Sequence, residues 1–370
     1  MGSLIQQIVA ILVLFIAGSL YPVLNSTILT YNFRFKGSLF LCFQQPWFQT
    51  LIAFLGLSFF IIPSLIYTKF SKKKNNSKQD NQYTNLAIFR LSSSASILRI
   101  ISVGLQTYSL TFMPVNVWQI FSEFYLLFTA LFAVIFKQEK LHFTDWVGLF
   151  FTVLGIALAG VSALLRSISE RSNAITELFF SFILQILSHA LQSFSVLSQE
   201  NLLKESSPIT LTAFEGLWGV YLIGLIILPL VNVTDSHAIG IHETTADLPY
   251  FFKNSTALIP LEIGFLLLFG LYRFSCFYLF SKSSYRESVY KSFLPVTVWI
   301  TTLIRHQIYK DNLTVSFLDK YSILEIVGIV FTLLGSLIYH KIIKLPCFGY
   351  SKESLENHET RMMKTDYVLE

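Results

Sequence analysis

The chain has 370 residues, of which 53% are hydrophobic and only 13% are charged, and its formal net charge is +5. A soluble protein carries about 25% charged residues, so this composition excludes a water-soluble protein. The three cysteines, Cys42, Cys276 and Cys347, are too few and too scattered for a disulfide framework or a zinc site. The sequence is therefore that of an integral membrane protein, which we expect to be all-α.

Ten segments have the length and hydrophobicity of a membrane-spanning helix. Such a helix needs about 20 mostly apolar residues. The segments are roughly 4–24, 48–67, 86–110, 116–136, 144–165, 176–198, 211–232, 258–280, 288–306 and 322–342. The third and the ninth are the weakest, because each contains charged residues. An even number of spans places both termini on one side of the membrane.

One motif occurs twice, which indicates an internal duplication. Val-Gly-x-x-Phe-Thr-x-Leu-Gly begins at Val147 and again at Val327, an offset of 180 residues. Two glycines seven residues apart lie on one face of a helix, where a neighbouring helix can approach closely. The alternative is a generic packing motif that arose twice. The repeat predicts two five-helix halves, residues 1–170 and 171–342, followed by a disordered cytosolic tail at 343–370.

Basic residues and sequons indicate the orientation. Residues 69–78 contain five lysines, and the C-terminal segment from residue 341 contains five more basic residues. Because cytosolic loops are enriched in lysine and arginine, both termini are expected in the cytosol. With this topology, four Asn-x-Ser/Thr sequons fall in or beside non-cytosolic loops and are candidate glycosylation sites. They are Asn25, Asn232, Asn254 and Asn312.

The sixth span carries a polar stripe. Gln185, His189 and Gln192 follow one another at i, i+4 and i+7, which places them on one helix face. Because polar groups are costly in hydrocarbon, this face should line a cavity or join an interhelical hydrogen-bond network. The sequence favours neither alternative over the other. His189 would titrate near neutral pH, so it is also a candidate for proton coupling.

Charged residues occur in the third and fourth spans. Gln119 and Glu123 are four residues apart in the fourth span, and Arg99 lies in the third. Counted from the short connecting loop, Glu123 is about 12 Å deep and Arg99 about 16 Å deep, at the helical rise per residue. We therefore expect an intramembrane ion pair between Arg99 and Glu123, with either a transport role or a structural one.

Three further charges lie toward the predicted cytosolic side. Glu215 and Lys291 begin the seventh and ninth spans, where their side chains could extend to the lipid headgroups. Arg273 lies deeper in the eighth span and is harder to explain in this way. Catalytic motifs are absent, which argues against an enzyme and against a cofactor. The residues His237, His242 and Glu243 could bind a metal in a loop, but nothing in the sequence fixes their geometry.

Several short stretches resemble one known family. They are Phe-Gln-Gln-Pro-Trp-Phe-Gln at 43–49, Trp-Gln at 118–119, Phe-Thr-Ala-Leu-Phe-Ala-Val at 128–134, Trp-Val-Gly at 146–148, Gln-Glu at 199–200 and Glu-Gly-Leu-Trp-Gly at 215–219. Their order and spacing resemble the drug/metabolite transporter superfamily. Within it they are similar to the nucleotide-sugar-transporter-like solute carrier family 35, F branch. The charged positions Arg99, Glu123 and Lys291 depart from the residues typical of this branch.

The resemblance implies an alternating-access carrier in an endomembrane such as Golgi, endosome, lysosome or vacuole. The solute would be an organic metabolite such as a nucleotide sugar, held in a cavity lined by spans three, four, six, eight and nine. Arg99, Arg273 and Lys291 would attract an anionic group. Glu123 would be a counter-charge or a proton-coupling site, and Gln119 would join the polar stripe in orienting the solute.

The expected partners are thus a small-molecule solute and the lipid bilayer. A homodimer is compatible with the sequence, whereas nucleic-acid binding, a metal and a cofactor are not expected. The alternative function is a membrane interaction or regulatory protein that keeps the transporter fold without transport. It would act through the lysine-rich loop at 69–84 and the tail.

Overall fold

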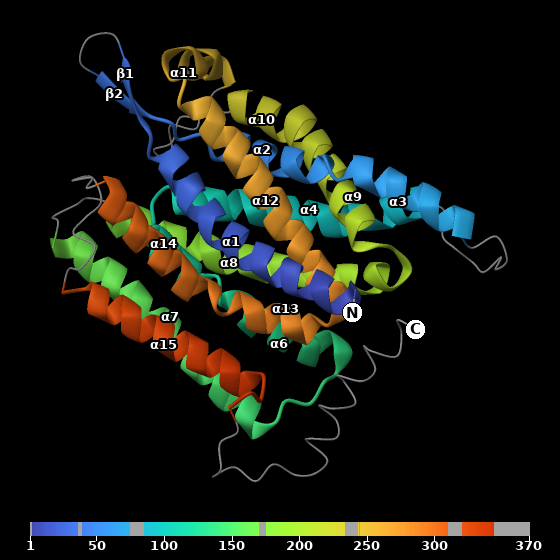
Figure 1. Cartoon of the computed structure of the whole chain (residues 1–370). Coiled ribbons are helices and arrows are strands. Elements are labelled where there is room, and N and C mark those ends of the chain that lie inside the picture. The colour runs from blue at the N-terminus through green and yellow to red at the C-terminus, as the bar shows by residue number, and fades with distance from the viewer. Residues whose placement is uncertain are drawn as a thin grey trace. The chain divides into compact units, whose positions relative to one another are not determined.

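The computed structural model describes residues 2–35, 39–74, 85–169, 175–233, 243, 245–309 and 320–343. Apart from one two-stranded hairpin, the regular elements among these residues are helices (Figure 1). In this described part of the chain, nine helical segments are long and apolar enough to cross a membrane. The prediction of a helical membrane protein is confirmed, with nine candidate spans where the sequence predicted ten.

The elements follow the chain in two stretches. The first contains α1 (Gly2–Leu29), β1 (Asn32–Phe35), β2 (Leu39–Cys42), α2 (Pro46–Ser58), α3 (Ile61–Lys74), α4 (Asn85–Leu110), α5 (Val115–Phe121), α6 (Phe124–Lys137) and α7 (Phe143–Ser169). The second contains α8 (Ile175–Glu205), α9 (Pro208–Leu222), the π-helical turn η1 (Ile223–Ile227), α10 (Leu228–Val233), the short 3-10 helix η3 (Thr245–Asp247), α11 (Leu248–Asn254), α12 (Leu258–Lys282), α13 (Ser284–Lys291), α14 (Leu294–Tyr309) and α15 (Ser322–Tyr339).

Local chemistry explains several helix boundaries. Helices α2 and α9 each begin with a proline. At this first position the backbone N–H has no partner within the helix, so proline, which lacks an N–H, costs no hydrogen bond. The Ser207 hydroxyl accepts a hydrogen bond from the backbone N–H of Thr210 at 3.2 Å and caps α9. The antiparallel β1–β2 hairpin pairs Asn32 with Cys42 and lies between the first two predicted spans.

Three of the predicted spans are broken helices. The span 48–67 is divided into α2 and α3, the span 116–136 into α5 and α6, and the span 288–306 into α13 and α14. The expectation of a single helix at 288–306 was wrong, and α14 has only 16 residues. The second residue of α14 is Pro295, which has no N–H to continue the hydrogen-bond ladder from α13.

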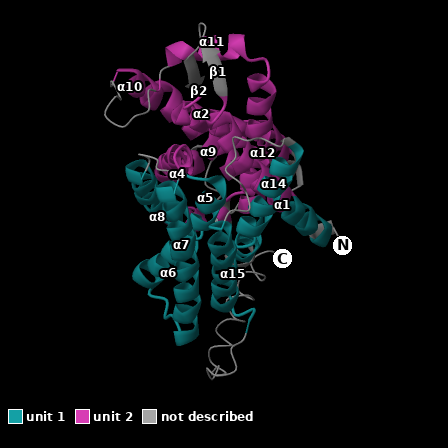
Figure 2. Ribbon diagram, turned by 90° about the vertical axis from the view of Figure 1, so that its left-hand side faces the viewer, with its two compact units in different colours: residues 1–12, 113–193, 278–370 teal, residues 13–112, 194–277 magenta. Residues whose placement is uncertain are grey.

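The chain forms two compact units (Figure 2). Unit 1 comprises residues 1–12, 113–193 and 278–370, and unit 2 comprises residues 13–112 and 194–277. Each unit combines segments from both predicted halves of the chain, so the units do not coincide with those halves. The division of the sequence into repeats at residue 170 stays a prediction.

In unit 1, the two copies of the repeated motif pack against each other. Helices α7 and α15 lie side by side (Figure 1). A Cβ atom added at Gly155 would lie 2.5 Å from the carbonyl oxygen of Gly328, so only glycine permits this approach. The rings of Phe151 and Phe331, which are equivalent positions of the motif, stack with centroids 5.8 Å apart. The predicted close approach is confirmed, and the neighbouring helix is the other copy.

In unit 2, α2 packs against both α9 and α12. An added Cβ at Gly216 of α9 would meet the backbone of Leu57, and one at Gly56 would meet the backbone of Leu266. These glycines let the three helices approach closely enough for polar side chains to meet between them. The same packing positions the charged residues described next.

Candidate functional site

The eight residues predicted to contact a solute are all buried. The most exposed of them, Lys291, has 9% of its surface accessible. They are Arg99, Gln119, Glu123, Gln185, His189, Gln192, Arg273 and Lys291. Arg99 and Arg273 belong to unit 2, and the other six belong to unit 1. Within each unit, the contacts of these side chains show which of them act together.

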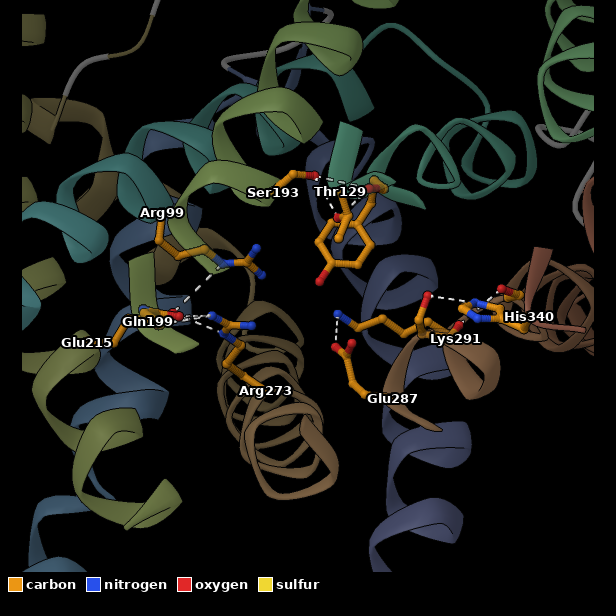
Figure 3. Close-up of polar contacts among 12 residues, drawn as sticks. Arg99, Thr129, Ser193, Gln199, Glu215, Arg273, Glu287, Lys291 and His340 are labelled. Carbon is orange, nitrogen blue, oxygen red and sulfur yellow. Dashed lines mark hydrogen bonds and ion pairs between the residues drawn. The ribbon is translucent and has the colours of Figure 1, made fainter. Parts of the chain in front are cut away.

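Unit 2 holds a group of four buried side chains from four helices, which we call the arginine cluster (Figure 3). It consists of Arg99 from α4, Gln199 from α8, Glu215 from α9 and Arg273 from α12. Arg273 binds Glu215 through two hydrogen bonds of 3.0 Å, from Nε to Oε1 and from Nη2 to Oε2. The Gln199 amide donates to Glu215 Oε2 at 3.0 Å. Such a bidentate pair fixes both side chains.

Arg99 is held much less firmly than Arg273. Its Nε lies 3.8 Å from Glu215 Oε1, which is close enough for an ion pair but too far for a hydrogen bond. Its Nε and Nη1 atoms are buried and have no hydrogen-bond partner among the residues that the structure describes. The expected Arg99–Glu123 ion pair is wrong, because the carboxylate beside Arg99 is Glu215.

The arginine cluster therefore carries one uncompensated positive charge. Its two guanidinium groups share a single carboxylate, and all three charged side chains are at most 4% exposed. The expectation that Glu215 extends to the headgroups was wrong, since Glu215 is 1% exposed. Buried donors without partners are costly, so an anionic group bound at Arg99 would satisfy both its charge and its free N–H groups.

Unit 1 holds a second charged group at two helix breaks, which we call the break cluster. Glu123 lies in the α5–α6 break, beside Lys291 at the end of α13 and Ser292 in the α13–α14 break. Lys291 forms an ion pair with Glu287, and its Nζ lies 4.6 Å from the centroid of the Tyr125 ring. The expectation that Lys291 extends to the headgroups was therefore wrong. In transporters, interrupted helices often border the binding site.

The polar stripe on α8 faces the interior of unit 1. Gln185 donates to the backbone oxygen of Trp118 in α5 at 3.3 Å, which is an interhelical hydrogen bond. His189 and Gln192 are 2% and 6% exposed on the same helix. Gln119 donates to the Ser122 hydroxyl at 2.9 Å, next to the α5–α6 break. The stripe was expected either to line a cavity or to join an interhelical hydrogen-bond network. The contact of Gln185 is of the second kind.

Sequence reasoning did not place Gln199 and Glu287 in the site. Gln199 lies one residue beyond the predicted end of the sixth span, whereas α8 continues to Glu205. Glu287 lies one residue before the predicted start of the ninth span, whereas in the structure it lies in α13 and is 3% exposed. If the sixth span had been predicted to end at residue 205, Gln199 would have been a candidate site residue, because a polar residue within a span is a functional candidate by default.

The candidate glycosylation sites differ in accessibility. Asn25 is only 4% exposed in α1, whereas Asn232 and Asn254 are exposed in α10 and α11. Asn312 lies outside the described residues, as do His237, His242, Cys347, the loop residues 75–84 and the tail from residue 344. Within the described ranges, no group of three His, Cys, Asp or Glu residues could hold a metal ion.

A helical bundle with nine candidate spans in its described part, paired copies of one motif and buried charges at broken helices is typical of membrane transporters. Residues 7–161 match the EamA-like transporter family. Over this segment the chain is therefore similar to that family, which is part of the drug/metabolite transporter superfamily.

The chain is also distantly homologous to solute carrier family 35 member F6. It is 21% identical to that protein from Homo sapiens over 194 residues, which is 52% of this chain and 51% of the relative. The same protein from Pongo abelii is also 21% identical, and that from Rattus norvegicus is 20% identical. The match therefore spans about half the length of these curated relatives. The resemblance to the F branch of family 35 is confirmed.

Proposed function

We propose that the protein is a carrier that moves an organic anion across an endomembrane by alternating access. Similarity to the transporter family supports transport, and the arginine cluster supports an anionic solute. The observation that carries the proposal is Arg99, a buried cation that shares its carboxylate with Arg273 and has N–H groups without partners among the described residues. A phosphate-bearing metabolite such as a nucleotide sugar has the matching charge and acceptor oxygens.

The two arginines have different roles in this proposal. Arg273 is a positioning residue, because Glu215 occupies its Nε and Nη2 atoms. Arg99 is the group that binds the anion. Gln119, Glu123 and Lys291 of unit 1 remain predicted solute contacts.

A thermal-shift screen of the detergent-purified protein tests the proposal. The panel contains nucleotide sugars, nucleotides, phosphorylated metabolites and organic cations. A ligand that binds only the folded state at a hundred times its Kd adds about 2.7 kcal/mol of stability. We expect a dose-dependent rise in Tm with one class of anion, and loss of that rise in Arg99→Gln.

A matched control comes from the other unit. Arg166 forms an ion pair of 2.9 Å with Glu325, and the two side chains are 12% and 2% exposed. Arg166→Gln also removes a guanidinium from an ion pair, but it should leave the anion-dependent rise in Tm intact. No response to any anion in a folded protein would contradict the proposal and favour the non-transporting membrane partner.

A further inference from the structure

Glu262 is a buried carboxylate that has no cation beside it among the described residues. It lies on α12, one turn from the start of the helix, and is 5% exposed. Its one hydrogen bond comes from the Gln49 side chain of α2, with Nε2 and Oε1 2.5 Å apart. The other carboxylate oxygen, Oε2, and the Gln49 amide oxygen are buried without a hydrogen-bond partner.

The other buried acids in the described part of the chain are compensated. Each is next to a lysine, an arginine or the N-terminal N–H groups of a helix. These acids are Glu123 and Glu287 beside Lys291, Asp145 beside Lys341, Glu215 beside Arg99 and Arg273, Glu325 beside Arg166, and Glu243 at the start of α2. Glu262 forms no ion pair with any described residue, so it differs from all of these buried acids.

An ionised carboxylate inside a membrane protein costs several kcal/mol unless a positive charge neutralises it. From this geometry we propose that Glu262 and Gln49 form a binding site for a monovalent cation, either a proton or Na⁺. One carboxylate supplies one negative charge, which matches a single monovalent ion. The Gln49 amide can donate to the ionised carboxylate, and its oxygen can accept from a protonated one or coordinate Na⁺.

The position of Glu262 connects this site with the arginine cluster. Glu262 and Arg273 lie on the same helix, α12, eleven residues apart. Eleven residues are about three turns, so both side chains lie on one face, about 16 Å apart along the axis. If the proposed transport is correct, the cation at Glu262 is the coupling ion of the carrier. The binding of the cation itself does not depend on that transport.

The test compares wild type with Glu262→Gln, which keeps the hydrogen-bonding shape and removes the charge. The Tm of each protein is measured from mildly acidic to mildly alkaline pH, in choline buffer and in Na⁺ buffer. We expect the Tm of wild type in choline to fall as the pH rises, and to fall less in Glu262→Gln. Glu243 is present in both proteins, so the difference between the curves isolates Glu262.

The sodium arm distinguishes the two cations. If Na⁺ binds, it restores the Tm of wild type at alkaline pH and has no such effect on Glu262→Gln. If only a proton binds, the two proteins differ with pH but neither responds to Na⁺. Parallel curves for both proteins in both buffers would overturn the proposal.

A second measurement needs no variant, in case Glu262→Gln does not fold. Hydrophobic carbodiimides modify protonated carboxyl groups in apolar surroundings, and peptide mass spectrometry locates the adduct. We expect Glu262 to be modified at acidic pH and protected at alkaline pH or by Na⁺, while Glu215 between its arginines stays unmodified. An unmodified Glu262 at every pH, when the reagent modifies other buried carboxyls, would overturn the proposal.

The failure of this proposal is distinguishable from a failure of the proposed transport. In Arg99→Gln, the cation response should persist while the anion response is lost. A protein that responds to the cation but to no anion would retain the Glu262 site and lose the anion-carrier function. A protein that responds to an anion but shows no Glu262-dependent cation response would support the anion-carrier function and overturn the Glu262 site.

Discussion

Helix α12 carries two buried charged sites of opposite character. In the arginine cluster, one carboxylate, Glu215, faces two guanidinium groups. Three turns away on the same helix, Glu262 is hydrogen-bonded to a neutral amide. Both glutamates are almost fully buried, at 1% and 5% exposed. Burial alone therefore does not define the role of an intramembrane acid; the charge balance of its neighbours does.

The comparison separates structural charges from charges open to a ligand. An excess of buried positive charge favours an anion, and an excess of buried negative charge favours a cation. Glu243 is intermediate, because two backbone N–H groups at a helix N-terminus compensate its charge only partly. The following variants test how the charge balance around these buried carboxylates affects stability and ligand binding.

The largest effect is expected for Glu215→Gln. This change leaves Arg99 and Arg273 buried without a carboxylate, and breaking a buried pair in this way costs about 3–5 kcal/mol. A fall in Tm and in the yield of monodisperse protein would measure it. Adding Arg99→Gln to the same protein should recover part of the loss, because one stranded cation is removed. An unchanged Tm in Glu215→Gln would contradict the view that the Glu215 carboxylate stabilises the two buried arginines.

Glu243 should give a smaller effect that depends on pH. Burial raises the pKa of this loop carboxyl to about 7, although the N–H groups of Phe48 and Trp47 favour its ionised form at 2.8 Å and 3.1 Å. The folded protein then holds the proton more strongly than the unfolded chain, whose pKa is close to 4.5. Stability contributed by this proton is complete below pH 4.5 and is lost as the pH rises to about 7.

The loss at Glu243 amounts to at most about 3 kcal/mol. Measuring Tm against pH for wild type and Glu243→Gln checks the prediction, and the variant should show a flatter curve. The same comparison in a Glu262→Gln background shows whether the two carboxyls act independently. If Glu243→Gln keeps the full pH dependence of wild type, Glu243 does not titrate in this range.

The smallest effect is expected for Gln199→Leu. The variant removes the hydrogen bond from Gln199 to Glu215, but both arginines remain beside the carboxylate. Losing a hydrogen bond to a charged group costs about 1.5–3 kcal/mol, and the remaining bidentate pair places this site at the lower end. The anion response in the thermal-shift screen should persist with a small change in apparent affinity. Complete loss of that response would give Gln199 a direct contact with the solute.

Local hydrophobicity in the sequence was sufficient to predict the class of the protein and much of its helix pattern. Hydrophobic runs are local, and the bilayer requires each run to satisfy its own backbone hydrogen bonds as a helix. The repeated motif also predicted a close helix contact, which Gly155 and Gly328 make in unit 1. The breaks at 59–60, 122–123 and 292–293 were missed.

Only the tertiary structure determined the partners of the buried charges. Depth along neighbouring helices suggested Arg99 with Glu123, but helix rotation and packing bring Arg99 to Glu215 of α9. Gln49 and Glu262 are 213 residues apart, and nothing in either local sequence indicates the other. A sequence shows that a charge is buried through its hydrophobic surroundings. Which group compensates that charge depends on contacts between distant helices, which only the packed fold defines.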